Sequence, residues 1–362
     1  MNAPATLPGG PRPSPASWWT DAEPLECVAS LPEAPDVVTF SFQSPSGALF
    51  HFLPGQFLTL ELPVPGGPLL RTFTISSSPS RPTSLTITVK AQDGSIGARW
   101  MIDNLVKGMT LKAHGPAGNF TCAGRPSRKL LFISAGSGIT PMNSMMTWLY
   151  DSGREMDIVA VNCARRPSEI IFRQRMETMA SRMEGIDLKW VVSGPDPYKP
   201  WTGYQGRFNQ LMLGLMAPDY LERDVYCCGP DAFMQAVREA LTGLGFDMER
   251  YFQESFHPPA PEEPAPAEDV VPDEESRAEV VFASSGLSAR CNETDTLLNV
   301  ARAAGAPIPS GCTFGVCGAC KTKKVEGQVH MVHNGGITED DIEAGYVLAC
   351  CSHPIGKVVL EA

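Results

Sequence analysis

The chain has 362 residues and a formal net charge of −11 at pH 7, so it suits two or three domains and is a poor match for nucleic acid or an anionic membrane surface. Its hydrophobic content of 43% is that of an ordinary globular protein, and no apolar run is long enough to cross a bilayer. Eleven cysteines are spaced too irregularly for a secreted disulfide framework, which indicates a protein of the reducing cytoplasm.

Residues 1–20 are rich in Pro, Ala and Gly and lack the features of a signal peptide, so we expect a disordered tail. From residue 21 to 124, short segments of alternating apolar residues are separated by glycine and proline turns, which predicts a small antiparallel β-barrel. The expected strands cover 25–42, 57–62, 70–76, 84–90 and 109–113, with a short helix within 93–104.

Between residues 125 and 256, continuous apolar strands alternate with helical patterns, which predicts a parallel sheet covered by helices. The expected strands are 129–134, 158–162, 188–192 and 224–228, and the expected helices are 142–150, 170–183 and 231–244. Gly136–Pro141 forms the first turn, with Pro141 at the first helical position.

Residues 257–277 consist mainly of Pro, Ala, Glu and Asp, and we expect a stiff, self-repelling linker because such a segment cannot form a core. Residues 278–362 predict a compact mixed α+β fold. Its expected elements are a hairpin of 278–282 and 287–290, a helix Leu297–Ala304 capped by Asp295, strands 321–325 and 347–349, and a short helix 339–343.

Four cysteines in this last domain have the spacing of a plant-type [2Fe–2S] site: C-x₄-C-x₂-C and a distant fourth ligand. They are Cys312, Cys317, Cys320 and Cys350. A structural zinc site is the alternative, but zinc sites usually combine two short knuckles, and here the fourth ligand stands alone. This motif resembles that of plant-type ferredoxins, which implies a ferredoxin-like (β-grasp) fold for residues 278–362. Since neighbours in a strand face opposite ways, only one of Cys350 and Cys351 can reach the cluster. We expect Cys350, because the Leu348-Ala349-Cys350 context resembles the last ligand of that family.

Arg71-Thr72-Phe73-Thr74, at the end of a barrel strand, resembles the flavin signature of the ferredoxin–NADP reductase superfamily. The resemblance implies that Arg71 binds the pyrophosphate, Phe73 stacks on the cofactor and Thr74 reaches flavin N5. A plain β-strand is the alternative interpretation of so short a pattern.

Three further segments resemble flavin-binding elements of that superfamily. The segment Thr88-Val89-Lys90 resembles a flavin-binding strand, and Gly94-Ser95-Ile96-Gly97 resembles a phosphate-binding turn. The segment Gly115–Phe120 resembles the G-P-x-G-x-F loop of the FAD-binding members. Gly97 stands where a hydroxyl is usual, so either a backbone N–H serves or the register differs. Because Gly115–Phe120 resembles the loop of FAD-binding members, FAD is favoured as the flavin, with FMN as the alternative.

Gly136-Ser137-Gly138-Ile139-Thr140-Pro141 follows a buried strand and opens a helix, so its N–H groups suit a pyrophosphate. This turn resembles the pyridine-nucleotide turn of the superfamily, and Cys228-Gly229-Pro230 resembles the superfamily's element beside the nicotinamide. The resemblance implies that Thr74 and Cys228 flank the reacting flavin and nicotinamide rings. Phe256, in Glu254-Ser255-Phe256, corresponds to an aromatic residue that approaches the flavin in some relatives. Simple packing is the alternative for Cys228 and Phe256.

The pair Arg165-Arg166 follows the second parallel strand, where the ribose 2′-substituent is selected. An arginine there favours NADPH, unless Glu169 holds it outward. Because relatives that feed oxygenases mostly use NADH, we expect NADH, with NADPH as the alternative.

A nucleotide gives two electrons at once and the cluster takes one, whereas a flavin can accept two and release them singly. The domain order thus implies an electron-transfer chain on one polypeptide, an NAD(P)H-dependent oxidoreductase. Glu254–Phe256 and the segments Met331–Ile337 and Leu348–Ser352 resemble reductase components of Rieske-type monooxygenases that demethylate quaternary amines such as glycine betaine. Reductases of hybrid-cluster proteins and a non-catalytic redox sensor or adaptor are the alternatives.

Overall fold

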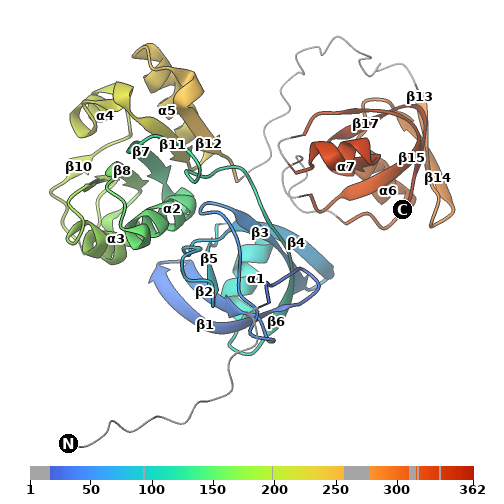
Figure 1. Ribbon diagram of the computed structural model, residues 1–362, viewed down its shortest axis with the longest axis horizontal. Coiled ribbons are helices and arrows are strands. Elements are labelled where there is room, and N and C mark those ends of the chain that lie inside the picture. Colours follow the sequence, from blue (N-terminus) through green and yellow to red (C-terminus); the bar gives the residue numbers. More distant parts are fainter. Residues whose placement is uncertain are drawn as a thin grey trace, which may run out of the picture.

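The computed structural model describes residues 17–92, 94–197, 199–256, 277–309, 315, 318–333 and 336–362, with the side chains of 339 and 340 excepted. These residues form three units (Figure 1). The first and third each have one hydrophobic core and the second has one on each face of its sheet, and Val37 of the first unit packs into one of these two. No helix among them is long and apolar enough to cross a membrane.

The first unit is an antiparallel barrel, as the sequence predicted. Its strands run in the order β4-β3-β6-β1-β2-β5, and a bridge between Ile75 and Ile87 joins the two edge strands. The strands are β1 Leu25–Ala34, β2 Val37–Gln43, β3 Phe57–Val64, β4 Gly67–Thr74, β5 Leu85–Lys90 and β6 Thr110–Ala117, with the helix α1 Ile96–Asn104 between β5 and β6. Trp19, which the sequence assigned to the tail, lies in the barrel core.

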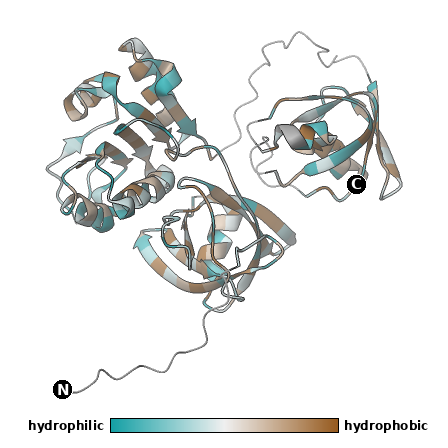
Figure 2. Cartoon of the chain, viewed as in Figure 1, coloured by the Kyte–Doolittle hydropathy of each residue, from teal (hydrophilic) through white to brown (hydrophobic). Residues whose placement is uncertain are grey.

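The second unit is a parallel sheet in the order β10-β9-β8-β7-β11-β12, also as predicted. Its strands are β7 Lys129–Ala135, β8 Asp157–Ala164, β9 Ile186–Val192, β10 Tyr204–Gln205, β11 Asp224–Cys228 and β12 Tyr251–Glu254. Helices α2 Ile139–Ser152 and α3 Arg173–Ala180 pack on one face, and α4 Gln210–Met216 and α5 Asp231–Gly243 on the other. The central strands are largely hydrophobic (Figure 2), as burial on both faces requires.

Two helix starts differ from the prediction. Helix α2 begins at Ile139, directly after the 3₁₀ turn η1 Gly136–Gly138, so Pro141 is the third helical residue and not the first. Its missing N–H still costs nothing, because the first four N–H groups of a helix have no internal partner. Helix α3 begins only at Arg173, because Phe172 before it adopts a left-handed conformation with φ of 58°.

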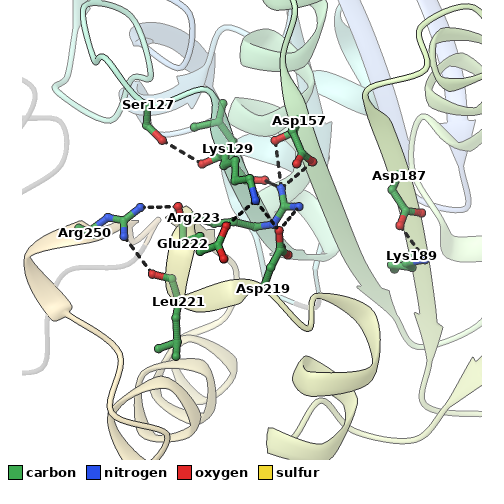
Figure 3. A network of polar contacts seen from close by, with 11 residues as sticks. Ser127, Lys129, Asp157, Asp187, Lys189, Asp219, Leu221, Glu222, Arg223 and Arg250 are labelled. Atoms are coloured by element: carbon green, nitrogen blue, oxygen red, sulfur yellow. Dashed lines mark hydrogen bonds and ion pairs between the residues drawn. The ribbon is translucent and has the colours of Figure 1, made fainter.

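An ion network around the buried Arg223 ties together the amino ends of three central strands (Figure 3). The Arg223 guanidinium, only 4% exposed, pairs with Asp219 and Asp157 and donates to the carbonyl oxygen of Leu130. Lys129 pairs with Asp219 and Glu222. Since ligands of parallel sheets bind at the carboxyl edge, this network stabilises the opposite edge.

The third unit is a mixed five-stranded sheet in the order β14-β13-β17-β15-β16, packed against α6. Its elements are β13 Arg277–Phe282, β14 Leu287–Asn292, α6 Leu297–Ala304, β15 Lys321–Met331, α7 Glu339–Glu343, β16 Tyr346–Leu348 and β17 Ser352–Leu360. Asp295 does not cap α6: the Thr296 hydroxyl accepts from the Asn299 N–H at 3.3 Å, while Asp295 accepts from the Asn292 N–H.

Candidate functional site

The flavin signature lies at the open end of the barrel. Arg71, Phe73 and Thr74 end strand β4, where Thr74 is buried opposite Phe57. Phe73 is half-buried against the barrel core. The Arg71 side chain is exposed, and its only hydrogen bond within the described part of the chain goes from Nη1 to the carbonyl oxygen of Leu70, at 2.8 Å. Four of its five N–H donors are therefore left for an anion among the described residues.

Gly97 packs directly against Arg71. A Cβ at Gly97 would lie 2.8 Å from Arg71 Cγ and 3.0 Å from Leu62 Cδ1, so no hydroxyl side chain fits there. Gly97 is the second residue of α1, and the Ser95 side chain makes no capping hydrogen bond to that helix. The N–H groups at the start of α1 therefore lie beside Arg71 and suit a pyrophosphate, as Gly94 and its turn predict.

The G-P-A-G-N-F loop packs onto the start of β3. A Cβ at Gly118 would lie 2.8 Å from the Phe57 ring, and one at Gly55 would overlap the carbonyl oxygen of Phe120. Gly115 and Gly118 both have positive φ, of 115° and 109°. Such close approach and left-handed backbone explain the glycines of this loop. Val89 of the neighbouring strand β5 is 1% exposed, so only its backbone can face a cofactor.

The two nucleotide motifs meet at the carboxyl edge of the sheet. A Cβ at Gly138 would overlap the carbonyl oxygen of Cys228, which ends β11, the strand beside β7. Gly136 has φ of 54°, and the Thr140 hydroxyl donates to the carbonyl oxygen of Ser137 at 2.9 Å. The order of the strands reverses between β7 and β11, and dinucleotides bind at such a switch point.

Gly229 and Pro230 complete the turn that starts α5. Gly229 is tightly enclosed, since a Cβ there would lie 2.9 Å from Phe233 and 3.1 Å from Ala135 Cβ. Pro230 is exposed at the N-cap of α5. Pro141, Thr140 and Gly138 are all buried in the facing turn. The residues of both predicted nucleotide motifs are thus brought together.

Hydrogen bonds join the flavin strand to the nucleotide turn across the domain boundary. The Asn143 side-chain amide donates to the carbonyl oxygen of Ser76 at 2.7 Å, and the Ser144 hydroxyl donates to that of Ser77 at 2.6 Å. Ser76 follows Thr74 closely, and Asn143 follows Gly138. These bonds therefore hold the predicted flavin and nicotinamide sites against each other.

Lys90 reaches across the same boundary. Lys90 Nζ lies 3.7 Å from Glu169 Oε2. A Cβ at Gly136 would lie 3.8 Å from the same Lys90 Nζ atom. Glu169 Oε2 also accepts from Arg165 Nε at 3.1 Å, while the Arg165 side chain is 77% exposed. Glu169 therefore holds the Arg165 guanidinium in an ion pair, which is the arrangement that favours NADH over NADPH.

From the sequence we predicted a role for Phe256 but none for Glu254, which lies two residues before it and belongs to the site. Strand β12 pairs Glu254 with Cys228, and the Glu254 Oε2 atom is buried without a hydrogen-bond partner among the described residues. Burial raises the pKa of Glu254 to about 8. Burial, and then the neighbouring Glu254, raise the pKa of the Cys228 thiol well above its usual value. Phe256 is 40% exposed.

Two of the four predicted cluster ligands can be placed, while Cys312 and Cys317 lie outside the described residues. The Cys350 N–H donates to Cys320 Sγ at 3.4 Å, and the Gly315 N–H donates to Cys350 Sγ at 3.3 Å. Backbone donors to cysteine sulfur are what a [2Fe–2S] cluster requires of its thiolates.

Cys350 and Cys351 do not lie in a strand, so the alternation argument for choosing between them is wrong. Both belong to the 3₁₀ turn η5 Ala349–Cys351. Cys350 Sγ accepts from the Gly315 N–H, and the Cys350 N–H donates to Cys320 Sγ, whereas Cys351 Sγ lies 3.7 Å from the carbonyl oxygen of Leu348. The contacts of the turn still favour Cys350 as the ligand.

Comparison with known proteins identifies each unit. Three family models match: an oxidoreductase FAD-binding domain over residues 27–122, an oxidoreductase NAD-binding domain over 132–239, and a 2Fe-2S iron–sulfur cluster binding domain over 281–354. These models support FAD, NADH and a [2Fe–2S] cluster as the cofactors, against FMN and zinc.

Relatives match over nearly the full length. The chain is 70% identical to the stachydrine N-demethylase reductase subunit of Rhizobium meliloti, over 96% of this chain and 98% of that protein. It is 42% identical to the glycine betaine monooxygenase reductase subunit of Pseudomonas aeruginosa, over 95% and 96%. Phthalate dioxygenase reductase shares the fold, with a TM-score of 0.60 and 25% identity over 95% of this chain and all of that chain. The chain belongs to the family of monooxygenase reductase subunits that join an FAD-binding, an NAD-binding and a 2Fe-2S domain on one polypeptide.

Proposed function

We propose that the chain is the reductase subunit of a Rieske-type oxygenase that demethylates a quaternary amine. The observation that carries the proposal is the 70% identity to a stachydrine N-demethylase reductase subunit over 96% of the chain. Stachydrine and glycine betaine are both quaternary amines with a carboxylate, which makes this chemical class the common factor. The electron path runs from NADH through FAD and the [2Fe–2S] cluster to the oxygenase.

The residues act by binding and orientation. Arg71, Gly97 and the first turn of α1 hold the FAD pyrophosphate, and Phe73 and Thr74 line the flavin. The turn from Gly136 to Pro141 holds the NADH pyrophosphate, while Cys228, Gly229, Pro230 and Phe256 shape the nicotinamide side. When bound, FAD accepts two electrons from NADH and releases them one at a time.

Cys228 serves this reaction as a packed neutral thiol and not as a nucleophile, because burial favours its protonated form. The absence of a side chain at Gly138 lets the glycine turn pack directly against the Cys228 carbonyl oxygen. Asn143 and Ser144 tie helix α2 to the segment after Thr74 through their bonds to Ser76 and Ser77.

The domains span residues 21–124, 125–256 and 278–362, extended by Trp19 of the barrel core and by Arg277 of β13. The rest of the linker 257–277 lies outside the described residues. Cys312, Cys317, Cys320 and Cys350 hold the cluster. Cytoplasmic residence agrees with seven free thiols outside that set. These are Cys27, Cys122, Cys163, Cys227, Cys228, Cys291 and Cys351.

The decisive experiment combines the purified chain with the oxygenase subunit of a stachydrine N-demethylase or of a glycine betaine monooxygenase. NADH oxidation and formaldehyde release are measured with stachydrine, with glycine betaine and without substrate. Formaldehyde release that depends on the amine supports the proposal. A reductase that reduces a hybrid-cluster protein but no Rieske oxygenase would favour the alternative role. If the chain oxidises NADH with none of the three acceptors (the Rieske oxygenase, the hybrid-cluster protein or ferricyanide), it would be a sensor or adaptor.

A further inference from the structure

A pocket of about 440 Å³ lies at the amino edge of the parallel sheet, the edge opposite to the glycine turn. Two of its lining residues, Arg128 and Met156, directly precede the strands β7 and β8. Cys122 lines it from the segment that joins the barrel to the sheet, and Trp148 from the end of helix α2. The described lining includes no residue of the flavin or nucleotide motifs, so the pocket is separate from the site above. Its volume is within the range of small-molecule sites.

Three arginines line this pocket without a carboxylate partner. Arg125, Arg128 and Arg154 are all exposed, and none of them forms an ion pair or a side-chain hydrogen bond with another described residue. Glu155 is the single acidic residue of the lining, so three positive charges and one negative charge leave a net charge of +2. The chain as a whole carries −11. Such a local excess of positive charge attracts anions.

Aromatic rings orient two of these guanidinium groups. Arg125 Cζ lies 3.7 Å from the centre of the Phe252 ring, and Arg154 Cζ lies 5.3 Å from that of Trp148. Stacking of this kind leaves the N–H donors of a guanidinium available for a ligand. Burial raises the pKa of the Cys122 thiol to about 12, while the charges of Arg125 and Arg154 lower it. Both guanidinium groups therefore lie near the Cys122 sulfur, at one wall of the pocket, and the thiol itself is neutral.

A buried hydroxyl near this wall also lacks a partner. Tyr226 is fully buried, and its hydroxyl oxygen makes no hydrogen bond among the described residues. Burial raises the pKa of Tyr226, and then Cys122 raises it and Arg125 lowers it, so the phenol lies near two residues of the lining. Buried polar atoms are almost always hydrogen-bonded in folded proteins. An unpartnered hydroxyl here indicates a place for a ligand group or for a bound water.

We propose that this pocket binds a small organic dianion, either a phosphate monoester or a dicarboxylate. Guanidinium groups pair with phosphate and carboxylate oxygens in bidentate fashion, and a dianion balances the net charge of +2. Leu130, Leu149 and Met156 give the lining an apolar part that suits the carbon skeleton of the ligand. Glycine betaine is disfavoured, because its quaternary ammonium group would meet three positive charges. The face of Trp148 that could attract such a cation already carries Arg154.

The bound dianion would connect two parts of the chain. Arg125 and Arg128 belong to the segment between the barrel and the sheet, whereas Arg154 belongs to the loop between α2 and β8. A ligand that pairs with arginines of both parts joins them and stabilises the folded chain by mass action. Binding should therefore raise the temperature of thermal unfolding.

Calorimetric titration of the full-length protein with FAD bound, at low salt, tests the proposal. The probes are phenyl phosphate, succinate and glycine betaine. At least one dianion should bind and glycine betaine should not, and the tighter dianion identifies the ligand as a phosphate monoester or a dicarboxylate. Arg128→Gln and Arg154→Gln should each weaken binding of that dianion about tenfold, because a charge-assisted hydrogen bond is lost. Arg182→Gln removes another exposed arginine from the same unit and should leave the affinity unchanged.

A second titration excludes binding at the nucleotide turn. Saturating NAD⁺ occupies that turn and should not displace the dianion. The rise in unfolding temperature caused by the dianion should disappear in Arg128→Gln and Arg154→Gln, which also shows that both variants fold. The proposal is overturned if neither dianion binds, if both variants keep the native affinity, or if NAD⁺ displaces the dianion. Binding of glycine betaine as tight as that of the dianions would overturn it as well.

Discussion

Gly138 lies so close to Cys228 that a Cβ at Gly138 would overlap the Cys228 carbonyl oxygen. This contact brings the glycine turn after β7 against the end of β11, where the strand order reverses. It joins two motifs that are far apart in the sequence, and it predicts that the second glycine of the turn does not tolerate a side chain.

Gly138→Ala should therefore disturb the nucleotide crevice and nothing else. We expect the KM for NADH to rise about tenfold or more, because the turn must move away from Cys228. FAD and iron content should stay at native levels. Gly214→Ala in α4 is the matched control, since a Cβ there meets nothing within 4 Å. Stopped-flow reduction of the flavin by NADH measures the effect, and native kinetics in Gly138→Ala would contradict it.

The cluster ligands give a second prediction. Cys350→Ser should abolish the visible absorbance of the [2Fe–2S] cluster, because Cys350 Sγ accepts from the Gly315 N–H and the Cys350 backbone lies against Cys320 Sγ. Cys351→Ser should keep that absorbance, since Cys351 Sγ is directed to Leu348. Iron analysis and visible spectra of both variants provide the measurement. Loss of the cluster in Cys351→Ser alone would show that the ligand had been assigned to the wrong cysteine.

Patterns with a short period predicted the fold well, because strand alternation and buried apolar runs depend on local sequence. The barrel, the parallel sheet and the glycine turns were all predicted in this way. The predictions that were wrong concern features that depend on backbone conformation or on contacts between residues far apart in the sequence. The start of α3 is set by the left-handed Phe172, and the α6 cap is Thr296 instead of its neighbour Asp295.

The missed site features have the same origin. Glu254 reaches Cys228 only because the four-residue strand β12 pairs with β11, and so short a strand has no periodicity to detect. Lys90 was assigned to the flavin strand, but its ion pair with Glu169 spans two domains. Sequence spacing gives no measure of such a contact.

Glu254 gives a prediction in pH. Burial raises its pKa from 4.5 to about 8 in the folded chain, so folding favours the protonated form. The stability present below pH 4.5 is therefore lost progressively as the pH rises toward 8, by at most about 1.4 kcal/mol per pH unit. Glu254→Gln cannot ionise, so its stability relative to the native chain should increase across this window and level off above it.

Thermal unfolding at several pH values between 5 and 9 measures the difference. Glu249→Gln, at an exposed position of the same region, is the control. A constant difference between the native chain and Glu254→Gln over the whole range would show that Glu254 titrates normally.

The last prediction concerns the choice of nucleotide. Arg165 is the residue that a 2′-phosphate would require, but its Nε lies 3.1 Å from Glu169 Oε2, which also faces Lys90 at 3.7 Å. We therefore expect kcat/KM for NADH to exceed that for NADPH. Arg165→Ala and Arg166→Ala should change the ratio little. Glu169→Gln should release Arg165 and shift the ratio toward NADPH by roughly tenfold, the effect of one charge-assisted hydrogen bond.

Steady-state kinetics with both nucleotides in the native chain and the three variants decides the matter. The Arg165→Ala/Glu169→Gln double variant separates two causes: if released Arg165 binds the phosphate, the double variant returns to the native ratio. If it keeps the shifted ratio, Glu169 acts through Lys90 and the position of the nucleotide turn. A native preference for NADPH that either alanine erases would show that an arginine already reaches the 2′-phosphate despite its ion pair.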